Sequence, residues 1–362
     1  MSQLVTQEDG VKIRCYERAM PEFVDAELER LYASSYASLS QMRIYHRGAP
    51  PMTYVASQAG RPIAVLMFRI EQNQIHVLNE VILISAIEIE RFVAYVFAHW
   101  RQAQAVLFRA IRTQLTSFSY IFQRINHLED IILTLPVTEQ AYLARLGKNT
   151  RRNLRRYGDR LREKFPHYVF TMMHAEAITA ACFNQVIELN RLRMVEKNKH
   201  SAYDAQSSDA LFRHVRQCGL VAMIVIDGRI CAGAIGVRSG HNFFLKVIAH
   251  DPAFDAYSLG MLCCYQTIVS CIAQGDREFH FLWGEYHYKY SLGGEHHPLD
   301  NLIFYRSPYH FIRQATLALD IARRGIARRL HLWLKSQQRQ RGKLFHLFET
   351  MKNLRIIFAN LF

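Results

Sequence analysis

Apolar and polar residues follow an order along the chain that occurs twice. Each half is expected to form hairpin strands, then a helix, then another strand, because runs with period two precede a stretch with helical period. In the first half these elements are predicted at Arg61–Arg69, Gln74–Ser85, Ala86–Gln104 and Ala105–Ile111. In the second half they are predicted at Leu220–Ile226, Arg229–Val237, Asn242–Ala249, Ser258–Ala273 and Glu278–Trp283. The repeat predicts two related α/β domains.

The length of the chain supports this division, since 362 residues exceed what one hydrophobic core usually serves. A boundary is expected near Leu135–Pro136, which gives domains at 1–136 and 137–308. From Tyr309 onward, apolar residues recur every three or four positions beside several arginines. This pattern predicts a basic amphipathic helical tail over 309–362.

Positive charge is concentrated in two segments, although the whole chain carries a net charge of +14. Arg145–Lys164 holds nine basic and two acidic residues, and Asn301–Phe362 holds twelve basic and two acidic residues. The first segment has leucines at helical spacing, with Arg151, Arg152 and Arg155 on its other faces. Guanidinium groups bind phosphate or carboxylate bidentately, so we interpret these arginines as substrate-binding, with a solvated helix face as the alternative.

The second basic segment could lie on an anionic membrane surface, or pack on the rest of the protein or on another subunit. No window of the sequence approaches the roughly 18 charge-free apolar residues of a membrane span. The first ten residues include Glu8 and Asp9 and lack the basic-then-apolar order of a signal peptide. We therefore expect a cytoplasmic protein whose contact with the inner face of the membrane would be peripheral.

Missing motifs remove the main support for several classes of enzyme. The sequence has no Gly-x-Ser-x-Gly, no Gly-x-x-x-x-Gly-Lys-Ser/Thr and no Gly-x-Gly-x-x-Gly. Its seven cysteines never form Cys-x-x-Cys, and its 17 histidines never form His-Glu-x-x-His. We therefore predict no metal site, and we expect the cysteines to be reduced thiols of the core.

The segment from Asp251 to Gly260 joins a β-rich run to an apolar helix. Ser258 is expected to cap that helix, whose first turn has unpaired N–H groups and a partial positive charge. Gly260 in this turn would let a bulky anion approach without meeting a β-carbon. The segment predicts a pyrophosphate site, with an ordinary capped core helix as the alternative.

The second half resembles the GNAT acetyltransferases associated with bacterial cellulose and exopolysaccharide synthesis, over about 222–294. The residues that carry the resemblance are Asp251, Pro252, Tyr257, Ser258, Gly260, Gly284, Glu285, Tyr288 and Lys289. Leu259 departs from that group, which often has proline there. The arginine-rich segment is also similar to that of the Fem-type peptidyltransferases, which are tandem GNAT folds. The resemblance implies tandem GNAT-like mixed-sheet domains of the α/β class, the first degenerate and the second catalytic.

The resemblance further implies acyl transfer from acetyl-CoA or another acyl-CoA, without a metal. The coenzyme pyrophosphate would lie at the start of the helix, at Tyr257, Ser258, Leu259, Gly260 and Met261. The acyl group would lie between the splayed strands Asn242–Ala249 and Glu278–Trp283. Glu285 would act as the base, Tyr288 as the acid and Lys289 as a counter-charge to phosphate or oxyanion. Spacing alone leaves an exposed i, i+4 ion pair of Glu285 and Lys289 as the alternative.

Three functions remain open from the sequence. The first is an acyl-CoA-dependent acyltransferase acting on an amine or hydroxyl of a cell-envelope, polysaccharide or other small precursor. The second is a Fem-type transferase that takes an aminoacyl group from tRNA, for which the basic charge is suitable. The third is a catalytically inactive GNAT scaffold that binds a nucleotide or a membrane synthase.

Overall fold

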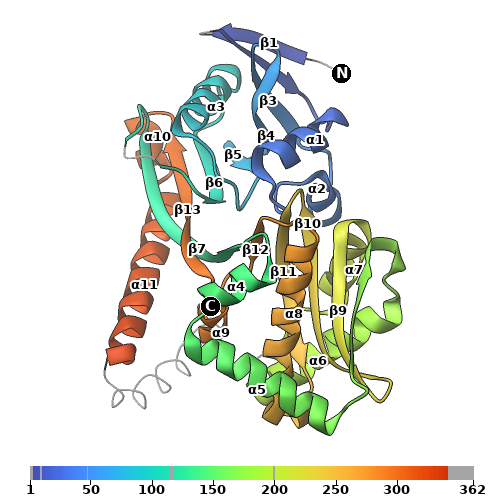
Figure 1. Cartoon of the computed structure of the whole chain (residues 1–362). Coiled ribbons are helices and arrows are strands. Elements are labelled where there is room, and N and C mark those ends of the chain that lie inside the picture. The colour runs from blue at the N-terminus through green and yellow to red at the C-terminus, as the bar shows by residue number, and fades with distance from the viewer. Residues whose placement is uncertain (1–2, 9, 47, 115–116, 199, 341–362) are drawn as a thin grey trace.

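The computed structural model describes residues 3–340, apart from residues 9, 47, 115–116 and 199. Within these residues, thirteen strands form one mixed sheet in the order β1-β2-β3-β4-β5-β6-β13-β7-β12-β11-β10-β9-β8. Figure 1 shows the two halves of this sheet one above the other, joined where β7 and β13 run side by side. The predicted α/β fold class is confirmed.

The first half contains six strands in chain order, and three helices cover it. The strands are β1 (Gln3–Glu8), β2 (Val11–Tyr16), β3 (Met52–Gln58), β4 (Arg61–Glu71), β5 (Gln74–Val77) and β6 (Ala105–Ile111). The helices are α1 (Phe23–Tyr32), α2 (Leu39–Tyr45) and α3 (Ala86–His99). Helix α3 supplies Phe92, Val93 and Val96 to a core shared with Phe68 and Phe108 of the sheet. Burial alternates along β2 and β5, as a period-two pattern predicts, whereas the middle of β3 and of β4 is buried on both faces.

The second half has the strand and helix order that the sequence predicts. Its strands are β7 (Ile121–Thr134), β8 (Val169–His174), β9 (Gly219–Ile226), β10 (Arg229–Ser239), β11 (Asn242–His250), β12 (Glu278–His280) and β13 (Glu295–Tyr305). Its helical segments up to β13 are α4 (Glu139–Arg145), α5 (Lys148–Lys164), η1 (Ala175–Ala177), α6 (Ala180–Glu196), α7 (Ala205–Cys218), η2 (Pro252–Tyr257), α8 (Leu259–Ala273) and α9 (His287–Ser291). Buried residues of α5 and α8 share one core with the sheet, and those of α6 and α7 share another.

Two predicted strands are shorter than expected. The strand predicted at Gln74–Ser85 ends at Val77, and Leu83 makes only an isolated bridge with Arg112. Val81 adopts a positive φ of 54°, which β-branched residues rarely tolerate and which breaks the extended run. The strand predicted at Glu278–Trp283 ends at His280, because Leu282 has a φ of 58°. Helix α3, which was predicted to end at Gln104, ends at His99.

The chain after β13 forms α10 (Pro308–Arg313) and α11 (Ala315–Gln340), and α11 packs along β7. The part of the predicted tail beyond residue 340 lies outside the described residues. The predicted boundary at residue 136 falls just after β7, whose two edges pair with β13 and β12. The sheet is therefore continuous past this point, and the division into domains stays a prediction.

Candidate functional site

Strands β11 and β12 part after a short parallel pairing. Asn242, Phe243 and Phe244 pair with Glu278, Phe279 and His280. Beyond Phe244, β11 continues to His250 paired only with β10 among the described strands. Strand β12 also pairs with β7, and the chain stays beside β7 after His280, since the amide of Phe281 donates to the carbonyl of Ile131 at 2.8 Å. The separation opens the sheet between β11 and residues 281–283.

Lys289 holds the chain that follows β12. Its ammonium donates to the carbonyls of Phe281, Leu282 and Trp283 at 2.8, 2.9 and 2.7 Å, and the residue is 3% exposed. Burial lowers the pKa of Lys289 to about 8. Three carbonyls take up the three hydrogens of the ammonium, so the described geometry gives this lysine a structural task. The alternative interpretation of Glu285 and Lys289 as an exposed ion pair is wrong, because Lys289 is buried.

Glu285 and Tyr288 lie on the loop and short helix that Lys289 anchors. Oε1 of Glu285 lies 3.9 Å from Nε2 of His296 on β13. Tyr288 packs edge-on against Phe281, and burial raises its pKa well above the usual value. Tyr288 therefore keeps its proton at neutral pH, as an acid must before it donates. The catalytic assignments of Glu285, Tyr288 and Lys289 stay predictions.

The start of α8 differs from the predicted cap. Ser258 is left-handed, with φ 50° and ψ 45°, and its side chain accepts no hydrogen bond from the helix. Its hydroxyl instead bonds Tyr157 of α5, and this bond is the largest cause of a lowered Tyr157 pKa. The Ser258 carbonyl accepts from Met261 and Leu262 at 3.0 and 3.1 Å. Among the described residues, the amides of Leu259 and Gly260 have no acceptor. Leu259 is 0% exposed, so only the amide of the half-buried Gly260 is available to a ligand.

Glycine is required at position 260 because the neighbouring His250 leaves no room for a side chain, and not because the position faces open space for a ligand. A β-carbon on Gly260 would lie 2.7 Å from Nδ1 of His250. The imidazole is fixed on its other side, where Nε2 lies 2.7 Å from Oδ1 of Asp255. The sequence interpretation that this glycine leaves room for an anion is therefore wrong for the side of the helix that faces His250. Cofactor binding by Tyr257, Ser258, Leu259, Gly260 and Met261 stays a prediction.

The arginine-rich helix α5 lies beside this helix start. The guanidinium carbon of Arg160 lies 5.7 Å from the centroid of the Tyr257 ring, and Phe165 packs edge-on against the same ring. The predicted substrate-binding residues Arg151, Arg152 and Arg155 are exposed on the same helix. The side chain of Arg155 is 86% exposed and lies 3.8 Å from Asp159, so this ion pair contributes little. Substrate binding by these three arginines stays a prediction, but α5 brings positive charge to the start of α8.

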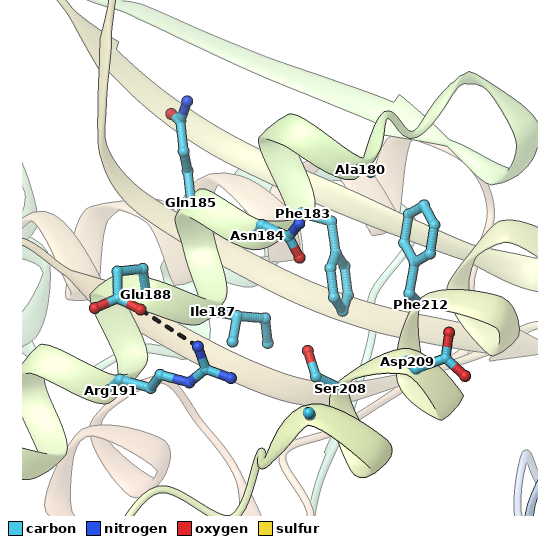
Figure 2. Close-up of a pocket in the computed structure, with 11 residues that line it drawn as sticks. Ala180, Phe183, Asn184, Gln185, Ile187, Glu188, Arg191, Ser208, Asp209 and Phe212 are labelled. Carbon is cyan, nitrogen blue, oxygen red and sulfur yellow. Dashed lines mark hydrogen bonds and ion pairs between the residues drawn. The ribbon is translucent and has the colours of Figure 1, made fainter.

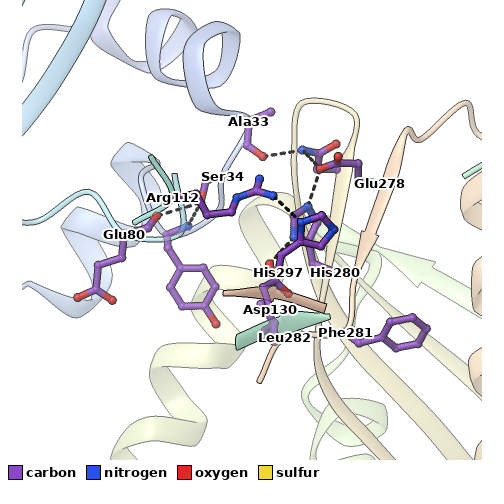
Figure 3. A network of polar contacts seen from close by, with 12 residues as sticks. Ala33, Ser34, Glu80, Arg112, Asp130, Glu278, His280, Phe281, Leu282 and His297 are labelled. Carbon is purple, nitrogen blue, oxygen red and sulfur yellow. Dashed lines mark hydrogen bonds and ion pairs between the residues drawn. The ribbon is translucent and has the colours of Figure 1, made fainter. Parts of the chain in front are cut away.

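A buried polar network that the sequence did not reveal links the two halves (Figure 3). His280 of β12 lies between two carboxylates, 2.7 Å from Asp130 and 3.1 Å from Glu278. Burial opposes the charge on His280, but these two hydrogen bonds raise its pKa. Asn242 bridges Glu278 and the carbonyl of Ala33 in the first half. The network depends on residues far apart in the chain, so no local pattern could have predicted it.

Lys246 of β11 is a second residue that the sequence did not single out. Its ammonium lies 3.5 Å from the centroid of the Tyr36 ring, which belongs to the first half. The sequence did contain one feature that could have pointed to Lys246, which is a lysine inside the apolar run Asn242–His250. A charged residue in a buried strand needs a partner.

A groove of about 620 Å³ lies between α6 and α7 (Figure 2). Arg191 crosses it, bonding Glu188 at 3.4 Å and the carbonyl of Tyr203 at 3.2 Å. Asp209 pairs with Arg213 at 3.1 Å. Because these charges pair within the protein, we assign no chemistry to the groove. Arg191 instead anchors the segment that contains Tyr203. The Tyr203 hydroxyl in turn donates to the carbonyl of Lys246 at 2.9 Å, so this segment lies beside Lys246.

Comparison with protein families identifies the second half. Residues 148–290 match the family model described as "Acetyltransferase (GNAT) domain". The chain therefore carries a GNAT-superfamily domain, and this part of the predicted resemblance is confirmed. The narrower resemblance to the cellulose and exopolysaccharide group stays a prediction. No curated protein matches the sequence.

Solved structures support the same fold. FemX is similar with a TM-score of 0.60 and 9% identity, over 81% of this chain and 98% of FemX. A conserved protein of unknown function from Bacteroides thetaiotaomicron is similar with a TM-score of 0.50 and 13% identity, over 79% of this chain and 96% of that protein.

Proposed function

We propose that the protein transfers an acyl group from acyl-CoA to an amine or hydroxyl of a small cell-envelope or polysaccharide precursor. One observation carries the proposal: β11 and β12 part beside the start of α8, where the amide of the half-buried Gly260 has no acceptor among the described residues. A helix start with free amides binds phosphate, and a gap between strands admits the pantetheine and acyl group. The two features together fit a coenzyme A thioester.

The basic face of α5 supports this arrangement. Tyr157 is bonded to Ser258, and Arg160 lies over the ring of Tyr257, so α5 is fixed against the start of α8. Positive charge close to the Gly260 amide would lower the free energy of a bound pyrophosphate. Tyr288 would give its proton to the departing thiolate. Glu285 is the base suggested by the sequence.

Thermal melts with candidate donors test the proposal. A ligand that binds only the folded state at about 100 times its Kd should stabilise the protein by about 2.7 kcal/mol. Acetyl-CoA and longer acyl-CoAs are expected to raise the melting temperature, with coenzyme A and ATP as controls for the thioester and for phosphate alone. No shift with any acyl-CoA would overturn the proposal.

A Fem-type, aminoacyl-tRNA-dependent transferase is the second candidate. Its support is the fold-level likeness to FemX together with the net charge of +14. Stabilisation by tRNA but not by acyl-CoA would favour it. A protein stabilised by acyl-CoA that consumes none in the presence of any acceptor would instead be a catalytically inactive scaffold.

We also propose peripheral contact with an anionic membrane through α10 and α11. Among the described residues, no helix is long and apolar enough to cross a bilayer. A stripe of exposed apolar side chains instead runs along these two helices, formed by Ile312, Leu319, Ile326 and Leu330, which are 54–72% exposed. Arg313, Arg323 and Arg324 are exposed on the same helices. Apolar side chains flanked by arginines fit the surface of an anionic bilayer.

A further inference from the structure

Lys246 occupies a bulge at the point where the two strands part. Ile235 of β10 pairs with Val247 of β11, but the next residue, Gly236, pairs with Leu245, so Lys246 is the extra residue of the bulge. The last pair between β11 and β12 is Phe244 with His280, two positions earlier. Bulges re-aim a side chain and often accompany functional sites. This one places a lysine at the mouth of the opening between the strands.

The side chain of Lys246 lies between the two halves of the protein, on the sheet face covered by α6 and α7. Its ammonium contacts the ring face of Tyr36, and Tyr36 packs against Phe244 and Trp283. Among the described residues, the ammonium has no carboxylate or carbonyl within hydrogen-bonding distance. An aromatic ring face is a weak partner for a partly buried cation. The proton of Lys246 is therefore held loosely.

Titratable groups from several elements face Lys246. They are His214 and Cys218 of α7, Tyr36 of the first half, Tyr203, and Asp130 of β7. Burial lowers the pKa of Lys246 to about 7, against smaller opposing effects of Cys218 and Asp130. Neither ring nitrogen of the fully buried His214 has a hydrogen-bond partner among the described residues, and burial lowers the pKa of His214 to about 3. It stays neutral and adds no charge beside the lysine.

Among the described residues, Lys246 forms no ion pair with Asp130, whose Oδ1 is buried without a hydrogen-bond partner. Oδ2 of Asp130 is bonded to His280, which is itself bonded to Glu278. A carboxylate that is shared with an imidazole is a weaker partner for a second cation. A direct Lys246–Asp130 bridge would stabilise the ammonium and prevent it from losing its proton near neutral pH.

We propose that Lys246 is the general base of acyl transfer, an inference that rests on the proposed function. Neutral Lys246 takes the proton from the acceptor nitrogen or oxygen, whose electron pair forms the new bond to the thioester carbon. The carbonyl π electrons move to oxygen, and they return when the carbon–sulfur bond breaks. The thiolate leaves with that bonding pair and receives a proton from Tyr288. The Lys246 ammonium then returns its proton to solvent, and the Tyr288 phenolate takes a proton back from solvent.

The geometry favours Lys246 over the other basic groups near the opening. The hydrogens of Lys289 are all donated to backbone carbonyls. Glu285 lies near His296 of β13, on the loop that follows β12. Lys246 alone of these three sits on the strand that lines the opening and bears a loosely held proton.

The test measures hydrolysis of acetyl-CoA, with water as the acceptor, in wild type, Lys246→Met, Lys246→Arg and Glu285→Gln. Both lysine variants should lose about two orders of magnitude in rate, together with the acid limb that wild type shows near pH 7. Acetyl-CoA affinity, measured by calorimetry, should not change. Hydroxylamine, whose nitrogen is already unprotonated at neutral pH, should be acylated at a rate that depends much less on Lys246. If Glu285 were the base instead, Glu285→Gln rather than the lysine variants would lose the rate and the acid limb, and that result would overturn the assignment to Lys246.

A second variant separates catalysis from structure. Lys246→Ala should regain part of its rate when small primary amines are added, more so with the more basic amines, which a merely structural lysine would not produce. Variants that melt like wild type and keep its rate and pH profile would overturn the assignment while leaving the proposed function intact. A wild-type protein that neither binds nor consumes acetyl-CoA would overturn both.

Discussion

The imidazole of His250 fills the space that a side chain on Gly260 would need, with Nδ1 2.7 Å from the position of a β-carbon. Gly260→Ala should therefore destabilise the protein by about 1–3 kcal/mol, although alanine favours a helix over glycine. Gly158→Ala in α5 is the matched control, because its β-carbon would meet only Arg162 at 3.7 Å. Urea unfolding measures both. A His250→Ala background should restore stability to Gly260→Ala, and a cost that persists there would contradict the contact.

Charge at the start of α8 should govern donor affinity. Met261 lies in the first turn of α8, where a carboxylate is ordinarily favourable to the helix. Met261→Glu should weaken acetyl-CoA binding by about tenfold or more relative to Met261→Gln, which has the same shape without the charge. Calorimetric titration compares the two, with melting curves to verify folding. Equal affinities would remove this helix start from the coenzyme site.

Loss of the Lys289 ammonium should unfold the loop after β12. Lys289→Met leaves three carbonyls without their donor, and we expect a loss of about 3 kcal/mol or more in the free energy of unfolding. Lys12→Met, at an exposed position on β2, should change stability little. Chemical denaturation followed by circular dichroism decides the matter. A Lys289 variant as stable as wild type would mean that water replaces the ammonium.

The stability of the protein should depend on pH through Lys246. Its pKa of about 7 in the folded protein lies below the value of about 10.4 expected in the unfolded chain. The unfolded chain binds more protons between these values, so stability rises with pH across this window and the cost of the lysine is complete below pH 7. Lys246→Met should thus be more stable than wild type at pH 6, by at least about 1 kcal/mol. The difference should vanish above about pH 10.5, and a difference independent of pH would contradict the lowered pKa.

The exposed stripe on α10 and α11 should bind anionic vesicles. Substitution of serine for Ile312, Leu319 and Ile326 should abolish sedimentation with vesicles that contain phosphatidylglycerol, since each residue is 63–72% exposed and packs on little else. The matched control replaces Ile87, Val137 and Val195, which are 65–93% exposed elsewhere. Binding should weaken with salt. The membrane proposal is wrong if the triple variant sediments like wild type. It is also wrong if the wild-type protein uses the stripe to dimerise.

Local pattern was enough to predict most of the elements. Strand β6 lies at the predicted Ala105–Ile111, and β9, β10, β11 and α8 differ from their predicted bounds by two residues or fewer. The family model confirms the GNAT domain. These features depend on residues close together in the chain, whose period fixes which face is buried.

Features set by distant partners could not be predicted. The left-handed Ser258 bonds Tyr157, which lies more than a hundred residues earlier in the chain. His280 bonds Asp130, which lies 150 residues earlier. In the sequence, Lys246 is only one polar residue in a predicted strand. The bulge that positions Lys246 depends on the register between β11 and β10, which the sequence does not show. The preference of each residue for helix or strand carries no information about such long-range contacts.

The position of β13 fixes the order in which the protein can be completed during synthesis. This strand comes late in the chain, yet it lies between β6 and β7 and is the neighbour that fills the edge of β6. Until residue 305 has left the ribosome, the first half therefore exposes an unpaired strand edge, which is prone to pairing with other chains. Nascent chains halted before β13 should depend on chaperones, whereas chains released after it can close the sheet by themselves.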